Sequence, residues 1–469
     1  MLSRLSGMRW KSPEQVSEPL ESRRTFGLAE VEIMNPLLVQ LLQETGIPDL
    51  EGTPREKAVA LLQMAAEVEH SFVVQYLYGA FSLDRTNQNG MAWNQVLFGI
   101  AEEEMGHLAT AQNLLALLGE PPHLDRQSFP APPTYPFEKI LKVFALDWLG
   151  DFVIAESPKG AALPPGVPPA PNMARVGTIY MNLYWLFKES EQPGQPWPIT
   201  NPGFSHEHLG DSDLANPAEL TDWLMTTVDW GQAPVLSGQP MAGFRILSHG
   251  PFGTRADERL GALEAIYDVA AQGEGPIPQA NSHFERLSRL YMSASALATL
   301  PCKNISDNPH TTPETTGNPE LEEGLITYPV ARKLATLFNL RYAMLLTEIG
   351  HVAQTPRTLK VNGEVVRKKL AQWAIHTEMH FIAALADSLN AQPLKATKTA
   401  QSDTRASAPF ELPEGFPSND RKRWQLYLNV FDQTKAIVTE LGDAVAGLSQ
   451  ITGADDARRP FILDRLGRS

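Results

Sequence analysis

The chain has 469 residues, a formal charge of −15 and a single cysteine, Cys302. The acidic balance argues against nucleic acids and anionic membranes as partners. One cysteine excludes internal disulfides and thiolate metal clusters, so any metal must be bound by Glu, Asp and His. There is no run of about 18 apolar residues and no signal-peptide pattern at the start. We therefore expect a globular, cytoplasmic protein of more than one domain.

A long helix is predicted for residues 54–83, because Thr53 and Pro54 form a helix start. It carries Glu67 and Glu69, whose side chains lie about 200° apart around a helix axis, so at most one of them faces the core. The helical neighbours of Glu69 are apolar or aromatic, whereas those of Glu67 are more polar. We predict that Glu69 is the inward carboxylate and the first metal ligand.

The next helix contains Glu104 and His107 and ends near Leu118, where Gly119 and two prolines follow. Glu104 and His107 are three residues apart and share the apolar face of this helix. A buried carboxylate and imidazole must be paired or bound, because an isolated buried charge is costly. Glu-x-x-His is the motif with which ferritin-like four-helix bundles bind iron or manganese. An ion pair in the core is the alternative explanation.

Further along the chain, irregular and helical segments alternate. Residues 119–173 are rich in proline and are predicted to be irregular, either as a strap over the bundle or as a cover of the active site. More helices are expected at residues 176–191, 255–271, 282–300, 329–354, 364–389 and 420–448. The domain organisation that we predict consists of an N-terminal arm (residues 1–50), a ferritin-like bundle with insertions (51–305) and a C-terminal helical region packed on the bundle (320–450).

A dinuclear carboxylate site needs about four carboxylates and two imidazoles, and the first two helices supply only half of them. Three pairs of residues compete to supply the rest: Glu274 with His283, Glu348 with His351 in a second Glu-x-x-His, and His376 with His380. Each pair also has a structural explanation, such as a solvated turn, a helix cap or an ordinary polar pair. Nucleophile-elbow, P-loop and dinucleotide-binding motifs are absent from the sequence.

Several segments together carry a family resemblance. They are Glu69-His-Ser-Phe-Val-Val-Gln-Tyr76-Leu, Ile100-Ala-Glu-Glu-Glu-Met-Gly-His107, Phe152-Val-Ile-Ala-Glu-Ser-Pro158, Gln272-Gly-Glu-Gly275 with Ser282-His-Phe284, and Tyr328-Pro-Val-Ala-Arg-Lys-Leu-Ala-Thr-Leu-Phe-Asn339. Over about residues 50–390 the chain resembles the ferritin-like family of the iminophenyl-pyruvate dimer synthase type. The same module occurs in the chromopyrrolate-forming enzymes of violacein and rebeccamycin biosynthesis.

The resemblance implies metal ligands at five positions, namely Glu69, Glu104, His107, Glu274 and His283. The family often has a glutamate where this chain has Ala271. This departure implies a mononuclear or altered site, or one that recruits Glu348 and His351 instead.

The expected fold is mainly α: a ferritin-like four-helix bundle with long proline-rich insertions and additional C-terminal helices. The expected function is a metal-dependent oxidoreductase of specialised metabolism that oxidises or oxidatively couples an amino-acid-derived small molecule with O2 or peroxide. Its cofactor would be mono- or dinuclear iron, with manganese as the alternative, and Tyr76 would line the site as a hydrogen-bond donor or redox partner. A homodimer is one option for the assembly. A non-catalytic scaffold of a biosynthetic complex and an iron-handling ferritin-like protein are the competing functions.

Overall fold

The computed structural model describes residues 52–130, 140–158, 161–168, 176–188, 208–216, 220, 223–225, 255–273, 281–313, 322–397 and 403–467. The predicted arm at residues 1–50 lies outside these ranges. The described part is mainly helical, with a short antiparallel hairpin of β1 (Lys360–Val361) and β2 (Glu364–Val365). The prediction of a mainly α fold is therefore confirmed.

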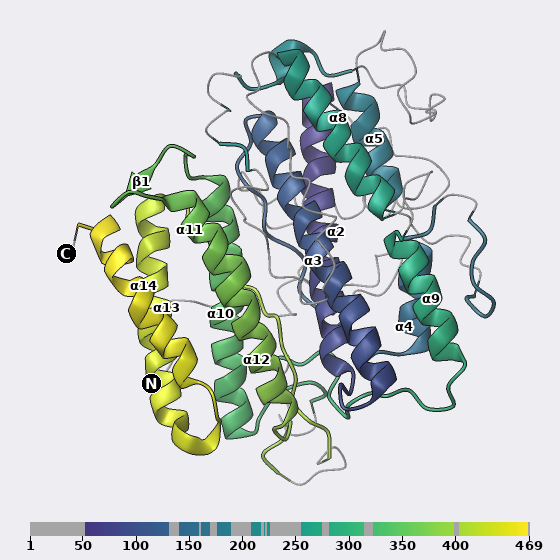
Figure 1. The fold of residues 1–469 in the computed structure, drawn as a ribbon, viewed down its shortest axis with the longest axis vertical. Coiled ribbons are helices and arrows are strands. Elements are labelled where there is room, and N and C mark those ends of the chain that lie inside the picture. The colour runs from purple at the N-terminus through teal and green to yellow at the C-terminus, as the bar shows by residue number, and fades with distance from the viewer. Residues whose placement is uncertain are drawn as a thin grey trace, which may run out of the picture.

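Two long antiparallel helices, α2 (Pro54–Ser82) and α3 (Gln88–Leu117), form the centre of the first helix group (Figure 1). The predicted start of α2 is confirmed, because the Thr53 hydroxyl accepts a hydrogen bond from the Glu56 amide and the Glu56 carboxylate accepts one from the Thr53 amide. Gly119 follows α3 with φ +76, a conformation that favours glycine. The short connection between the helices keeps them side by side, so Glu69 and Glu104 can meet.

Four further helices surround this pair. They are α4 (Leu146–Ala155), α5 (Gly177–Phe187), α8 (Arg255–Gln272) and α9 (His283–Ser295). In Figure 1, α5 and α8 lie together at one end of the α2–α3 pair, and α4 and α9 lie together near the other. The prediction that residues 119–173 are irregular is wrong at α4. The flanking prolines lie outside the ten-residue apolar run, which forms a buried helix.

The second helix group follows in the chain. It consists of α10 (Pro329–Ala353), α11 (Val366–Trp373), a π-helical turn (Ala374–Glu378), α12 (Met379–Asn390), α13 (Asp420–Leu441) and α14 (Ser449–Arg465). The π turn interrupts the helix predicted at residues 364–389, and α14 lies beyond the last predicted helix. In Figure 1 this group lies beside the first, with α10 against α3 and α12 against α2. The predicted domain boundaries stay a prediction.

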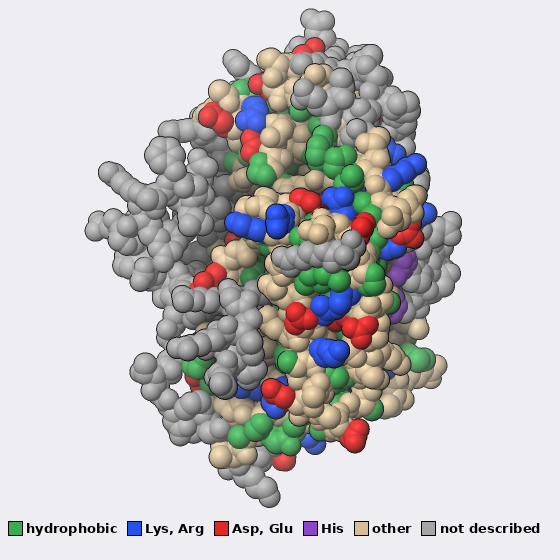
Figure 2. Space-filling view, turned by 90° about the vertical axis from the view of Figure 1, so that its left-hand side faces the viewer, with side chains coloured by type: hydrophobic (Ala, Val, Ile, Leu, Met, Phe, Trp, Pro, Cys, Tyr) green, Lys and Arg blue, Asp and Glu red, His purple; other side chains and the backbone are tan. Residues whose placement is uncertain are grey.

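Charged side chains of both signs are mixed on the face of the molecule seen in Figure 2. Figure 2 shows the side that lies at the left of Figure 1, where Lys and Arg alternate with Asp and Glu and form no large patch of one sign. Among the helices of the described ranges, none has both the length and the apolar character needed to cross a membrane.

Candidate metal centre

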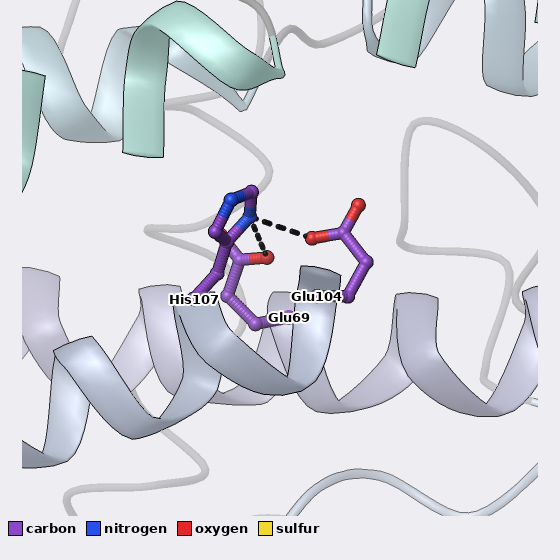
Figure 3. A group of neighbouring side chains, drawn as sticks. All are labelled: Glu69, Glu104 and His107. Carbon is purple, nitrogen blue, oxygen red and sulfur yellow. Dashed lines mark hydrogen bonds and ion pairs between the residues drawn. The ribbon is translucent and has the colours of Figure 1, made fainter. Parts of the chain in front are cut away.

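Glu69 of α2 meets Glu104 and His107 of α3 in the core of the first helix group (Figure 3). His107 Nδ1 lies 2.8 Å from Glu104 Oε2 and 3.4 Å from Glu69 Oε2. All three side chains are buried, with exposed fractions of 1–2%. The inward face predicted for Glu69 and the shared face predicted for Glu104 and His107 thus bring these residues together.

A second group shares Glu104 with the first. His283 Nδ1 lies 2.9 Å from Glu104 Oε1 and 3.5 Å from Glu156 Oε2. Glu156 is the C-cap of α4 and His283 is the first residue of α9, so the packing of these two helices positions both side chains. In each group of three, the candidate ligand atoms lie within 4.8 Å of one another.

The two imidazoles are held from outside the cluster. His107 Nε2 contacts Gln272 Oε1 at 2.8 Å, and His283 Nε2 contacts Glu103 Oε2 at 2.8 Å. Glu103 is in turn paired with Arg286. Contacts of this kind fix the orientation of metal-binding histidines, and here they leave both Nδ1 atoms facing the carboxylates.

Two tyrosines hold the carboxylates that are not shared. The Tyr180 hydroxyl donates a hydrogen bond to Glu69 Oε1, and the Tyr76 hydroxyl donates one to Glu156 Oε1 at 2.6 Å. A Cβ atom at Gly273 would lie 3.1 Å from Glu156 Oε2, so the glycine leaves room for this carboxylate. Tyr76 therefore lies next to the cluster, and its catalytic role stays a prediction.

The donor atoms fit a metal ion. Glu104 Oε1, Glu156 Oε2 and His283 Nδ1 are close together and buried, but none forms a hydrogen bond of acceptable geometry within the described ranges. Leaving buried polar atoms unsatisfied costs about 1–3 kcal/mol each. Carboxylate oxygen and imidazole nitrogen are ligands of iron and manganese, so a bound metal would remove this cost.

Without metal, the cluster retains protons. Burial and the neighbouring Glu104 raise the pKa of Glu69 to about 7. Burial would lower the pKa of His107, but the charges of Glu104 and Glu69 outweigh it and raise the pKa to about 10. Burial would raise the pKa of Glu104, yet the charges of His283 and His107 lower it. A metal ion bound here would displace protons.

The remaining predicted residues lie elsewhere. Glu274 is outside the described residues, although Gln272 and Gly273 reach the cluster. The third pair lies on the surface of the second helix group, with His376 half-buried and His380 exposed.

Glu348 and His351 of α10 lie in a different network, and the structure does not bring them to the cluster. Glu348 faces Arg458 Nη1 at 3.3 Å, within a buried set of charges that also contains Arg341, Glu378 and Asp455. His351 Nε2 lies 2.7 Å from Asp420 Oδ1. Glu348 and His351 therefore have separate partners, a guanidinium group and a carboxylate.

The sequence interpretation missed Glu156 and placed Glu67 wrongly. Glu156 lies in the Phe152–Pro158 segment that carried part of the resemblance, and a carboxylate at the end of an apolar run was the signal that could have found it. Glu67 is buried as well as Glu69, so the prediction that at most one faces the core is wrong. Glu67 lies on another side of α2 and pairs with His123 at 3.1 Å.

Comparisons with known proteins agree with this geometry. The Ferritin-like family model matches residues 62–196, which include Glu69, Glu104, His107 and Glu156. The chain contains a ferritin-like domain. The chain is also 24% identical, over 419 residues, to dichlorochromopyrrolate synthase of Lentzea aerocolonigenes. That alignment covers 77% of this chain and 37% of the relative, so the chain corresponds to little more than a third of the relative's length.

A solved structure of a ferritin-like protein from Caulobacter vibrioides has 16% sequence identity and covers 77% of this chain and 100% of its own. Its TM-score is 0.40, a likeness too loose to support any conclusion.

Proposed function

We propose that this chain is a metal-dependent oxidoreductase of specialised metabolism. The iron ligands that we assign are Glu69, Glu104, His107, Glu156 and His283. The supporting observation is that buried carboxylate and imidazole atoms converge in two groups that share Glu104, with the candidate ligand atoms of each group within 4.8 Å of one another. Bound iron would supply redox chemistry with O2 or peroxide.

The substrate class that we propose is an amino-acid-derived small molecule, which would be oxidised or oxidatively coupled. Likeness to a dichlorochromopyrrolate synthase supports a biosynthetic role. The residues around the cluster have supporting roles: Gln272 and Glu103 orient the imidazoles, and Tyr180 and Tyr76 hold the outer carboxylates. A cytoplasmic location and a homodimer remain part of the proposal.

Metal content tests this proposal. The protein is loaded anaerobically with ferrous iron, desalted and subjected to elemental analysis. About two irons per chain would fill both groups around Glu104, and about one would fill a single group. Glu104→Gln should lose the iron, whereas the matched variant Glu348→Gln should retain it. A folded wild type that binds no iron would contradict the proposal.

One observation favours a different function, a non-catalytic scaffold. His107 already pairs with Glu104 and Glu69, so ion pairs alone satisfy part of the cluster. On this alternative, the wild type holds no metal. Glu104→Gln then has a lower unfolding temperature than the wild type and loses no cofactor.

A further inference from the structure

A row of aromatic side chains leads from the candidate metal centre toward the start of α3. The ring centroids are 6.5 Å apart between Tyr76 and Trp148, 5.9 Å between Trp148 and Phe144, and 5.5 Å between Phe144 and Trp93. Each of these side chains is at most 5% exposed. At the outer end, the Trp93 side chain is itself 5% exposed and is the most exposed of the four.

The inner end of the row is connected to the cluster by a proton pathway. The Tyr76 hydroxyl donates its hydrogen bond to Glu156, whose other oxygen faces His283. A tyrosine loses its phenolic proton readily only when it is oxidised with an acceptor at hand, and Glu156 Oε1 is such an acceptor. Electron and proton can therefore leave Tyr76 together.

Packing, and not hydrogen bonding, positions Trp148. Its buried Nε1 has no hydrogen-bond partner within the described ranges, although a buried indole N–H usually has one. A Cβ atom at Gly79 would lie 2.7 Å from Trp148 Cη2, so the indole fills the space over this glycine, one helical turn from Tyr76. Glycine inside a helix costs about 1 kcal/mol relative to alanine, and here it gives the indole its place beside Tyr76.

We propose that Tyr76, Trp148 and Trp93 form an electron-transfer route between the candidate metal centre and the protein surface, with Phe144 as the bridge between the two indoles. The route rests on the proposed function and would operate in the absence of substrate, when hydrogen peroxide takes two electrons and two protons at the iron centre and leaves as water. Two passages of the route, each delivering one electron, would then replace the two electrons. Tyr76 then gives one electron to the centre and its phenolic proton to Glu156 Oε1, and becomes a neutral radical.

In the remaining steps, the site of oxidation moves from Tyr76 to Trp148 and then to Trp93. Trp148 gives one electron to the Tyr76 radical, which takes its proton back from Glu156, and Trp148 becomes a radical cation. Trp93 then gives one electron to Trp148 across Phe144. A one-electron reductant in solution, such as ascorbate, restores Trp93. Each step transfers one electron, and the route protects the centre from its own oxidant.

The experiment uses full-length protein loaded with ferrous iron, whose iron content is measured first. Hydrogen peroxide is added without substrate, radicals are trapped by rapid freezing for electron paramagnetic resonance, and oxidised tryptophans are mapped by peptide mass spectrometry. The wild type should accumulate an aromatic radical and oxidation at Trp93. Trp148→Phe should leave the radical on Tyr76 and abolish the oxidation of Trp93, and Tyr76→Phe should abolish both.

Trp373→Phe is the control, because Trp373 is a buried tryptophan of the second helix group that packs on Phe461, outside the route. It should leave both signals unchanged. Iron-loaded Trp148→Phe with Trp93 oxidised as in the wild type would overturn the route alone. A wild type that binds no iron would overturn the proposed metal centre and the route with it.

Discussion

Residues 104–107 on α3 and 348–351 on α10 have the same Glu-x-Gly-His sequence and the same burial, yet their partners differ. Around Glu104 the partners are the imidazoles of His107 and His283, which are themselves candidate metal ligands. Around Glu348 the partner is Arg458, in a network of buried ion pairs. The first region has donor atoms for a metal, whereas the second supplies its own cations.

The pKa values of the two glutamates shift in opposite directions. The histidine charges lower the pKa of Glu104 in spite of burial. Burial and the neighbouring Glu378 raise the pKa of Glu348 well above its ordinary value, although Arg458 and Arg341 act against them. The motif therefore determines the spacing and burial of the two side chains, while elements remote in the sequence determine their chemistry.

Removing the Arg458 guanidinium, one of the two in the second region, should have the largest effect on stability. Arg458→Gln leaves Glu348, Glu378 and Asp455 without one of their partners, and breaking a buried ion pair costs about 3–5 kcal/mol. We expect a loss of this size in the free energy of unfolding, measured by urea denaturation.

Arg459→Gln is the matched control, since Arg459 is the next residue and its pair with Asp432 lies at the surface. Its cost should be about 0–1 kcal/mol. Equal losses for the two variants would show that the second region is not held together by its buried charges.

The raised pKa of Glu348 should make the stability of the second region depend on pH. Because the folded protein raises the pKa of Glu348, the proton on Glu348 stabilises the fold fully below the ordinary carboxylate pKa of about 4.3. This stabilisation is lost as the pH rises through the folded pKa. Glu348→Gln has no such proton to lose, so its stability relative to wild type should increase by up to about 1.4 kcal/mol per pH unit.

Urea denaturation of metal-free protein at several pH values checks this prediction. Thr347→Val is the control, because Thr347 is buried beside Glu348 and neither threonine nor valine has a side chain that titrates. If the free energies of unfolding of Glu348→Gln and wild type differ by the same amount at every pH, Glu348 is ionised in the folded protein over the whole pH range measured.

Local signals were enough to predict much of the fold. The Thr53 cap, the stop at Gly119 and the inward face of Glu69 are properties of a few neighbouring residues. Helix α4 was missed because prolines on both sides obscured a short apolar run. A carboxylate at the end of that run marks Glu156 as a candidate, but its contact with His283 depends on how α4 packs against α9.

The second Glu-x-x-His shows that the motif alone does not identify a metal ligand. Glu348 could not be separated from Glu104 by the motif, since both residues open a Glu-x-Gly-His sequence on a helix. The residue that distinguishes them, Arg458, lies 110 positions further along the chain. The packing of α14 on α13, and of α13 on α10, brings that guanidinium to Glu348.

The smallest effect that we predict compares one interior helix glycine from each region. A Cβ atom at Gly79 would lie 2.7 Å from Cη2 of the rigid Trp148 ring, and one at Gly350 would lie 2.8 Å from Leu124 Cδ1, at the end of a flexible side chain. Overpacking costs about 1–3 kcal/mol, and replacing glycine by alanine in a helix returns about 1 kcal/mol. Gly79→Ala should therefore lower the free energy of unfolding by about 1 kcal/mol.

Gly350→Ala should be neutral or slightly stabilising, because Leu124 can change rotamer while the indole of Trp148, packed between Tyr76 and Phe152, cannot. Chemical denaturation of both variants in the absence of metal makes the comparison. If both substitutions cost the same, the indole is not held more firmly than an ordinary leucine. Trp148 would then be a loosely packed ring, and the contrast between a region built around fixed aromatic rings and one built around fixed charges would fail.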